Sequence, residues 1–451
     1  MTDKSLDLGR GPILPLLLRM SWPSMAAMLS MALYNLMDTL WLARTSHQAV
    51  AALTVNFPVQ MILAALGVGT GVGAGSYAAR MFGAGNLEAA RKTAGQVFLL
   101  TFAFGTLLII LTLANPDGLL RLFGASDDIL PMARSYLTIV IFTSPCVLFF
   151  MMVNNLLRAE GRPNLSMHVV LVFSAIGMVL DPIFILGWGP IPAMGIRGAA
   201  YSAVISQSAA ALLSLYFISL RSSRYRLDRS LLLPDPGILR SIFQTGFPSI
   251  IMNFVVSAVI VVFNHALAPF GDEALATLGM CFRVNGVVMM LLFGVGHGVM
   301  PMVGFSAGAR SYERLIETVR EATRFSLILA VASFLLIEIL APQVLGLFST
   351  DPRLMAMAVP ALRIFVSAMV IIAPALVWIN MFIGLGKGST AMWLMFIRDM
   401  LLLVPLLIIL PPFFGVSGVW LAQPLSSVVA FFIIRHRALR EIRSFREAAA
   451  V

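Results

Sequence analysis

Long runs of apolar residues, separated by short polar stretches, fill most of the chain. A run of about 20 apolar residues is long enough to cross a bilayer as a helix. The pattern therefore predicts an all-α polytopic membrane protein with twelve spanning helices. Several runs are longer than a bilayer requires, which implies tilt or kinks at Pro23, Pro145, Pro248 and Pro374. The predicted spans cover residues 12–43, 50–79, 93–115, 131–158, 164–187, 197–220, 241–269, 274–307, 322–341, 357–385, 389–411 and 416–435.

The charged residues are consistent with a membrane protein and indicate which side of the membrane each end of the chain lies on. Only 12% of the 451 residues are charged and 59% are hydrophobic, whereas about 25% of a typical soluble domain is charged. Most of the 31 Lys and Arg fall on one side of the membrane if both termini are cytoplasmic, as the positive-inside rule requires. Topology thus accounts for the net charge of +10 without a nucleic-acid partner. We expect a multi-pass protein of the cell membrane with both termini inside.

The chain contains an internal repeat with a period of about 225 residues. Phe57 aligns with Phe282 and Asn155 with Asn380 at this offset. Near the end the offset becomes about 220, where Gly195 aligns with Gly415. Each half holds six spans, an even number, so the two halves share one orientation in the membrane. Two parallel six-helix bundles are an architecture typical of transporters that alternate access between two bodies.

The repeat also predicts how the chain is divided. The charged stretch between the two halves contains two prolines and has the composition of a linker. The predicted divisions are an N-lobe at 1–220, a cytoplasmic linker at 221–240, a C-lobe at 241–435 and a basic cytoplasmic tail at 436–451. We expect the protein to be a monomer.

Acidic residues inside spans are the strongest functional signal, because a charge at the bilayer centre is costly and normally faces a cavity or a partner. Asp38 and Asp181 each lie roughly 9 Å from the outer end of a predicted helix, so they share a depth in the N-lobe. A close pair of carboxylates in a low dielectric suits reversible proton capture. The alternative is that each one only hydrogen-bonds a neighbouring group. Asp38 aligns with Phe263, which places the ionisable site in the N-lobe alone.

The two remaining intramembrane acids have plainer interpretations. Asp399 adjoins Arg398 near the inner end of its span, which favours an ion pair or snorkelling of the arginine to the interface. Glu338 lies close to an outer end and is expected at the membrane interface. Neither is assigned to the coupling site.

Several polar residues are candidates for lining a substrate cavity. Tyr34 and Asn35 lie within about one turn of Asp38 on the same helix. Asn154 and Asn155 precede the inner end of the fourth span, and Ser202 lies on the sixth. Packing is an equal alternative for the residues near Asp38, and hydrogen bonding between helices is one for Asn155, because it recurs in the second half.

The sequence offers no conventional cofactor or metal site. Cys146 and Cys281 both lie in apolar stretches and are expected to pack there. The five histidines have no spacing typical of paired metal ligands. We therefore expect no cofactor apart from a coupling ion.

Three segments together resemble the multidrug and toxic compound extrusion (MATE) family. They are ALYNLMDT at 32–39, NNLLRAEGRP at 154–163 and LDPIFI at 180–185. The resemblance covers about residues 12–440 and implies twelve helices in two lobes. It also implies export of organic cations or amphiphilic drugs in exchange for entering H⁺ or Na⁺, with Asp38 and Asp181 as the coupling site.

Two departures from the family pattern narrow this expectation. Some relatives carry further acids on the seventh and tenth helices, whereas residues 241–269 and 357–385 contain none, which resembles the N-lobe-coupled branch. In members with an N-lobe sodium site, an Asn one turn before the second Asp contributes a ligand. That position is Gly177 here, so the resemblance favours protons and leaves sodium open.

Other functions remain as rivals at this stage. A lipid-linked oligosaccharide or lipid flippase of the same superfamily would share the architecture but carry an anionic cargo, and would need several basic residues in its cavity. Only Arg283 and Arg398 are assigned to spans. An intramembrane enzyme would need a catalytic motif that the sequence lacks, and a passive channel would have little use for the two-body repeat. We expect a secondary antiporter that works by rocking of the lobes, and not an enzyme.

Overall fold

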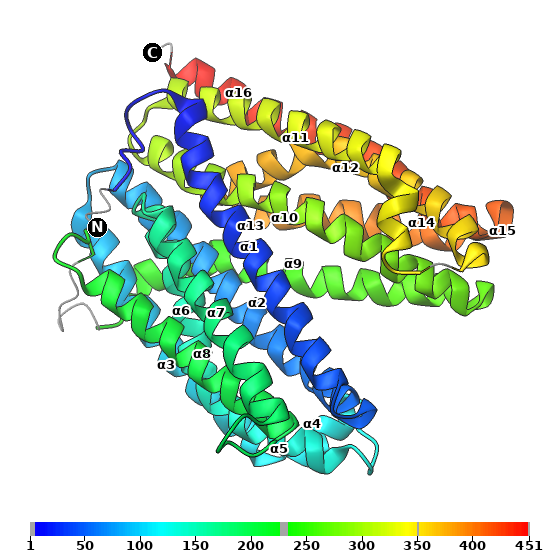
Figure 1. Cartoon of the computed structure of the whole chain (residues 1–451). Helices are drawn as coiled ribbons and strands as arrows, with labels where there is room; N and C mark the ends of the chain where they lie inside the picture. Colours follow the sequence, from blue (N-terminus) through cyan, green and yellow to red (C-terminus); the bar gives the residue numbers. More distant parts are fainter. Residues whose placement is uncertain (1–4, 226–232, 350, 450–451) are drawn as a thin grey trace. The chain divides into compact units, whose positions relative to one another are not determined.

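The computed structural model describes residues 5–225, 233–349 and 351–449 of the chain (Figure 1). The described residues are almost entirely helical, and their only extended pairing is an isolated bridge between Trp188 and Ile191. Among them, twelve helical stretches are long and apolar enough to cross a membrane. The predicted fold class and number of spans are therefore confirmed.

The first half of the chain forms the first six spans. Long helices provide five of them, and the fourth is built from two helices joined by a short 3₁₀ turn. The elements are α1 (Ile13–Ala43), α2 (His47–Gly83), α3 (Leu87–Ala114), the short α4 (Pro116–Leu122), α5 (Leu130–Val140), the turn η1 (Ile141–Thr143), α6 (Ser144–Ala159), α7 (Pro163–Leu186) and α8 (Ile196–Ser219).

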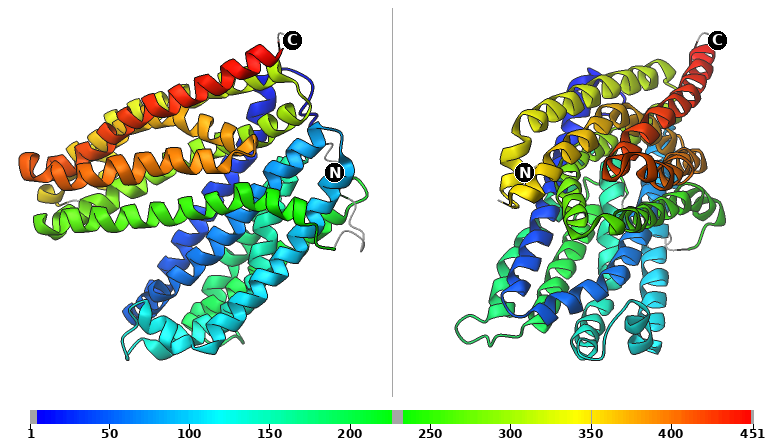
Figure 2. Two further views of the ribbon diagram at one scale, coloured as in Figure 1. Left: turned by 180° about the vertical axis from the view of Figure 1, so that it is seen from behind. Right: turned by 90° about the vertical axis from the view of Figure 1, so that its right-hand side faces the viewer.

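The second half repeats this plan. Its elements are α9 (Pro236–Leu267), the 3₁₀ turn η3 (Ala268–Phe270), α10 (Asp272–Gly308), α11 (Tyr312–Gly346), α12 (Pro352–Gly384), α13 (Gly388–Phe396), the π-helical segment η4 (Ile397–Leu403), α14 (Val404–Ile409), α15 (Pro411–Phe414) and α16 (Val416–Ala449). α16 lies alongside α12 and α11 (Figure 2).

The chain divides into two compact units, and two helices are split between them. Unit 1 comprises Met1–Leu6 and Ala26–Gly246, and unit 2 comprises Asp7–Met25 and Phe247–Val451. The first turns of α1 belong to unit 2, where a Cβ added at Gly298 would lie 2.5 Å from Ser21 Oγ. The first turns of α9 belong to unit 1. The two halves of the repeat thus exchange the beginnings of their first helices.

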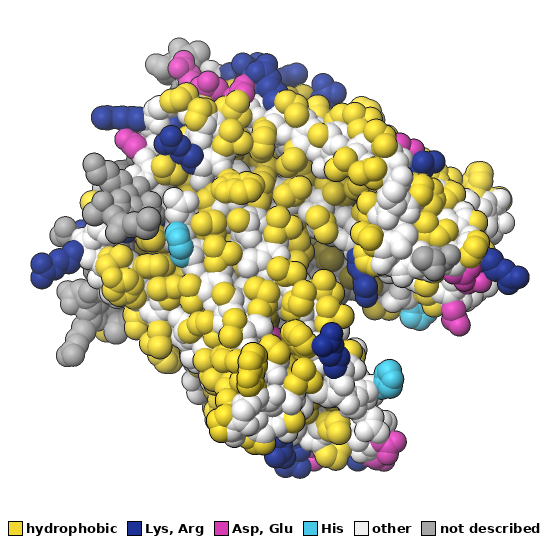
Figure 3. Space-filling view, viewed as in Figure 1, with side chains coloured by type: hydrophobic (Ala, Val, Ile, Leu, Met, Phe, Trp, Pro, Cys, Tyr) yellow, Lys and Arg dark blue, Asp and Glu magenta, His cyan; other side chains and the backbone are white. Residues whose placement is uncertain are grey.

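The predicted ends of several spans differ from the helix ends in the structure, because the ends of the helices are charged. Apolar side chains cover the helices, and charged side chains gather towards the ends (Figure 3). α11 begins at Tyr312, well before the predicted residue 322, and α16 continues through the predicted tail to Ala449. Hydropathy detects only the part of a helix that is apolar. Charged extensions are supported by local pairs such as Arg324 with Glu321 (2.8 Å), which hydropathy does not register.

Pro145 coincides with a break in a span. It follows η1 and occupies the first turn of α6, where its missing N–H costs no hydrogen bond. Pro23, Pro248 and Pro374 lie inside single helices. A proline can bend a helix without ending it, so tilt or kinks at these three positions stay a prediction.

The repeat is visible in the backbone and in side-chain packing. Gly161 and Gly386 both have positive φ, at 80° and 77°, a conformation that favours glycine. A Cβ added at Gly71 would lie 2.7 Å from Nδ2 of Asn155 in unit 1. At the repeat offset, a Cβ at Gly296 would lie 2.4 Å from Nδ2 of Asn380 in unit 2. The two halves thus share the backbone turn and this helix contact.

Candidate functional site

Asp38 and Asp181 come together inside unit 1. Asp38 lies on the second half of α1 and is partly buried, while Asp181 lies on α7 with none of its surface exposed. The two carboxylates are close enough to interact electrostatically. The equal depth that the sequence predicts thus brings the two acids into one site.

The unusual feature of Asp181 is that it has no cationic partner. Within the described residues no basic side chain forms an ion pair with it. The Ser202 hydroxyl of α8 interacts with its carboxyl group and also lies 3.5 Å from the carbonyl oxygen of Gly177. A buried carboxylate with only a neutral donor beside it is costly when ionised. The contact with Ser202 alone therefore does not compensate the charge of Asp181.

Tyr34 closes the site from α1. Its ring is buried, packs edge-on against Phe173 with centroids 5.0 Å apart, and interacts electrostatically with both acids. The ring fits because residue 177 has no side chain. A Cβ at Gly177 would lie 2.3 Å from Cε2 of Tyr34. An asparagine at this position could not coexist with Tyr34 as it stands.

Two further polar residues belong to the site, and sequence reasoning missed them. Tyr136, on α5, lies within electrostatic reach of both Asp38 and Asp181. Its hydroxyl accepts a hydrogen bond of 3.0 Å from Nε2 of Gln60, on α2. The available signal was that both are polar residues inside predicted spans. Their proximity to α1 and α7 depends on helix rotation, which one-dimensional spacing does not give.

The predicted cavity residues on α6 lie at the other end of the unit. Asn155 is near the α6–α7 turn, and Asp181 is roughly 20 Å further along α7 by helical rise. Asn155 Nδ2 donates to the carbonyl oxygen of Met151 at 3.1 Å, and its Oδ1 accepts from Arg158 Nη2 at 2.9 Å. Asn154 is also buried. The structure does not bring either asparagine to the acids.

Asn35 is the least enclosed of the predicted site residues. Its side chain is exposed although it directly follows Tyr34 on α1. Its backbone carbonyl accepts a hydrogen bond of 2.9 Å from the Thr39 hydroxyl. A role in lining a cavity therefore stays a prediction for Asn35, as it does for Asn154 and Asn155.

The model of the family described as MatE matches residues 23–183 and 248–409, one match in each half of the repeat. The chain belongs to the MatE family. The predicted resemblance is thereby confirmed, and the two matched segments reflect the internal repeat.

Two proteins that are similar to this MatE chain are named as multidrug exporters. The multidrug export protein MepA of Staphylococcus aureus (strain N315) is 26% identical over 431 residues, which are 94% of each chain. MepA of Staphylococcus haemolyticus (strain JCSC1435) is 24% identical over 93% of this chain and 92% of its own length.

Solved structures extend the similarity over almost every residue. One, of a multidrug resistance MATE family transporter of the MOP superfamily in an outward-facing conformation, has a TM-score of 0.93 and 26% identity, covering 99% of this chain and 100% of that chain. Another is a MOP superfamily transporter from Pyrococcus furiosus, for which a reverse polarity of the binding pocket is said to suggest a different function. Its TM-score is 0.91 and its identity 26%, covering 99% of each chain.

Outside the acid pair, this MatE protein holds its remaining intramembrane acids in ion pairs. Asp399 pairs with Arg398 through contacts of 2.7 and 3.0 Å within η4, as the sequence predicts. Glu338, partly exposed, pairs with Arg363 at 3.2 Å. Their charges are compensated locally, unlike that of Asp181.

A buried acid also organises the inner turn between α6 and α7. The Glu160 side chain is fully buried, accepts the Arg224 backbone N–H at 2.6 Å and the Ser223 hydroxyl at 3.3 Å, and lies 3.6 Å from Arg162. Burial raises the pKa of Glu160, and these partners act in the opposite direction. This turn therefore fastens the start of the linker to unit 1.

Proposed function

We propose that this MatE protein is a secondary active multidrug exporter, which expels organic cations or amphiphilic drugs in exchange for entering protons. Asp38 and Asp181 act as the coupling site, and the two lobes alternate access by rocking. The observation that carries the proposal is the fully buried Asp181, which has no ion-pair partner among the described residues and lies close to Asp38.

Protonation provides a physical coupling step. Without a cationic partner, Asp181 is most stable in its buried position when it is neutral or when a cation is near. A proton that arrives from one side removes the charge repulsion between the acids and favours one packing of α1 against α7. A ligand that prefers the other packing then competes with the proton, which is all that antiport requires.

Protons rather than sodium are favoured by the contact between Tyr34 and Gly177. A sodium ion needs several oxygen ligands around it. The position where an asparagine would supply an amide oxygen is occupied by the Tyr34 ring. Imposed pH and sodium gradients in liposomes distinguish proton coupling from sodium coupling.

The experiment uses the protein in liposomes loaded with a fluorescent organic cation. An imposed pH gradient should drive transport by the wild type, and a sodium gradient alone should not. Asp38→Asn should lose the proton-driven flux. Glu338→Gln is the matched control, because it removes an intramembrane carboxylate that is already paired with Arg363, and it should transport normally. Equal loss in both variants would contradict the assignment of Asp38.

The second candidate is a flippase for an anionic lipid-linked cargo. It is kept because the similar Pyrococcus furiosus transporter is described with a pocket of reversed polarity. The same liposomes distinguish the two functions. If the wild type moves no cation under either gradient, but translocates a labelled lipid-linked anion between leaflets, the flippase replaces the exporter.

A further inference from the structure

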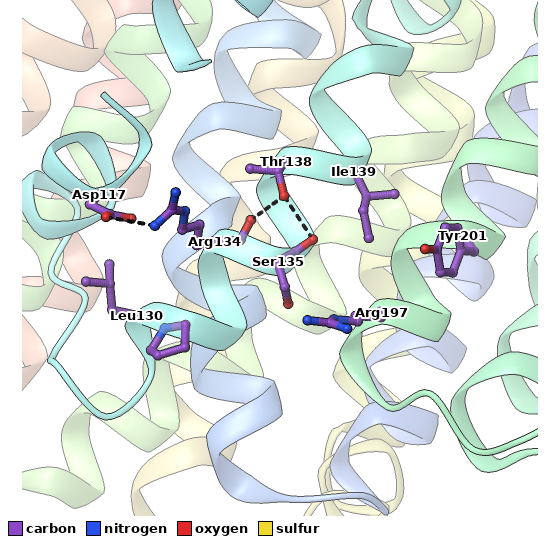
Figure 4. A pocket seen from close by; sticks show the side chains of 9 residues that line it. Asp117, Leu130, Arg134, Ser135, Thr138, Ile139, Arg197 and Tyr201 are labelled. Carbon is purple, nitrogen blue, oxygen red and sulfur yellow. Dashed lines mark hydrogen bonds and ion pairs between the residues drawn. The ribbon is translucent and has the colours of Figure 1, made fainter. Parts of the chain in front are cut away.

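An open pocket of about 510 Å³ lies in unit 1 where α5 and α8 begin (Figure 4). These are the first turns of the fourth and sixth spans, so the pocket is at one end of the membrane-crossing region. Its polar lining comes from α4, α5 and α8, and comprises Asp117, Arg134, Ser135, Thr138, Arg197 and Tyr201.

The charges around this pocket leave a positive surplus. Arg134 turns towards Asp117 and pairs with it at 3.2 Å. Arg197 reaches from α8 towards Ser135, and it has no ion-pair partner within the part of the chain that the structure describes. A second pocket, of about 330 Å³, is also lined by Arg197 and shares Pro131 and Ser135 with the first. A guanidinium that lines a pocket without an ion-pair partner is suited to an anion such as a phosphate.

The start of α8 adds to this preference. α8 has no side-chain cap at its first turn, so it directs N–H groups and the positive end of its dipole towards this region. The start of α5 adds less, because Pro131 has no N–H and the N–H of Leu130 already donates to a backbone carbonyl oxygen at 3.0 Å. The exposed ring of Tyr201 carries a further hydroxyl donor.

An apolar groove of about 350 Å³ continues along the same helix. It lies between α3, α6 and α8, and its lining includes Phe98, Phe102 and Phe149. On α8 it is lined by Ser208 and Leu212, which lie about two and three turns beyond Tyr201 on the same helix face. Phe102 and Leu212 are both well exposed. The polar pocket and the apolar groove are therefore two parts of one track down α8.

The length of this track matches one lipid chain. Tyr201 and Leu212 are roughly 16 Å apart by helical rise. Half of a bilayer core of about 30 Å is about 15 Å. We propose that this face of unit 1 binds one membrane phospholipid. Its phosphodiester lies against Arg197 at the first turn of α8, and one acyl chain follows α8 into the groove. In the proposed topology, this lipid belongs to the outer leaflet.

The test is native mass spectrometry of the full chain in detergent, titrated with phosphatidylglycerol, phosphatidylethanolamine or diacylglycerol with the same acyl chains. Wild type should retain one copy of either phospholipid, and about tenfold less diacylglycerol, because the charge-assisted contact is missing. Arg197→Ala should weaken phospholipid binding about tenfold and leave diacylglycerol unchanged. Ser208→Trp should fill the groove and weaken binding of all three.

The matched control is Arg121→Ala. Arg121 is an exposed arginine of α4 that pairs with Asp127 at 2.8 Å and lines neither the pocket nor the groove. It should retain phospholipid like the wild type, with all variants eluting as the wild type does in size-exclusion chromatography. Equal losses in Arg121→Ala and Arg197→Ala, equal affinity for diacylglycerol, or no retained phospholipid would each overturn the proposal.

Discussion

The two halves of the repeat place opposite chemistry at the same position. Unit 1 has Asp38 on α1, beside Asp181. Unit 2 has Phe263 on α9 at the repeat offset. Its ring is buried against Phe282 and Phe365, with centroids 5.7 and 6.1 Å away. One copy of the helix pair thus contains acids, and the other contains an aromatic core.

The same contrast holds for three of the four further residues around the acids, whereas the fourth, Gln60, aligns with another amide, Asn285. Tyr34, Tyr136 and Ser202 surround the pair in unit 1. Their repeat counterparts in unit 2 are apolar, and all belong to the cluster that contains Phe263: Val259, Ala361 and Ala422. Shared contacts such as Gly71 with Asn155 and Gly296 with Asn380 show that helix packing is common to both units. Polar chemistry at this position is therefore not needed for the fold, which supports a functional role in unit 1.

The largest expected effect is on transport. Asp181→Asn removes the ionisable group but keeps its size, so proton-driven cation efflux should fall to the level of empty liposomes. The variant should bind detergent and elute as the wild type does, because a neutral amide is easier to bury than a carboxylate. If proton-driven efflux persists in Asp181→Asn, Asp181 is not needed for coupling, and the difference between unit 1 and unit 2 at this position does not explain it.

The next effect concerns stability in unit 2. Phe263→Ala removes a buried aromatic ring from the apolar cluster and should lower the free energy of unfolding by about 3–5 kcal/mol. Thermal unfolding in detergent measures this, with exposed Phe432→Ala as the control. Proton dependence of transport in the surviving folded protein should be unchanged. A changed proton dependence would show that unit 2 also takes part in coupling.

A smaller effect is expected where Tyr34 packs against α7. Gly177→Ala places a Cβ 2.3 Å from Tyr34 Cε2, so the ring must move, at a cost of about 1–3 kcal/mol in unfolding free energy. Adding Tyr34→Ala should relieve the overlap and restore part of that loss. If Gly177→Ala is as stable as the wild type, the close contact does not position Tyr34 over the acids.

The smallest effect is a pH dependence at the inner turn. Burial raises the pKa of Glu160 in the folded state. The folded protein therefore holds this proton more tightly than the unfolded chain. The corresponding stability is fully present below the ordinary glutamate value of about 4.3 and is lost as pH rises through the raised pKa. Glu160→Gln should flatten the decline of the melting temperature with pH in this window, whereas exposed Glu273→Gln should not. An unchanged slope in Glu160→Gln would contradict the assignment.

Much of this architecture could be predicted from local sequence. The length of an apolar run identifies a membrane-spanning helix. An acid within such a run stands out, because burying its charge in the membrane costs free energy. Asp38 and Asp181 could therefore be paired by depth alone. Gln60 and Tyr136 could not, because their contact depends on how α2 and α5 are rotated about their axes. The contact of Tyr34 with Gly177 was hidden for the same reason, since an absent side chain leaves no pattern.

Near the α6–α7 turn, the sequence predicts cavity residues that the structure does not place at the acids. Asn154 and Asn155 are polar residues of the kind that line a cavity, but the Asn155 side chain forms hydrogen bonds with Met151 and Arg158. Its counterpart Asn380 makes the same bond back along its helix, to Leu376 at 2.9 Å. A residue kept in both halves is explained by packing that both halves need. Asymmetry between the halves is the more informative signal for function.

The central claim is that an organic cation and a proton compete at the acids of unit 1. The most direct test is to measure proton release when a cationic substrate binds to the detergent-solubilised protein in weakly buffered solution near neutral pH. Wild type and Glu338→Gln should release protons on binding, and Asp38→Asn should release fewer or none. Binding without proton release in the wild type, or undiminished release in Asp38→Asn, would contradict the account.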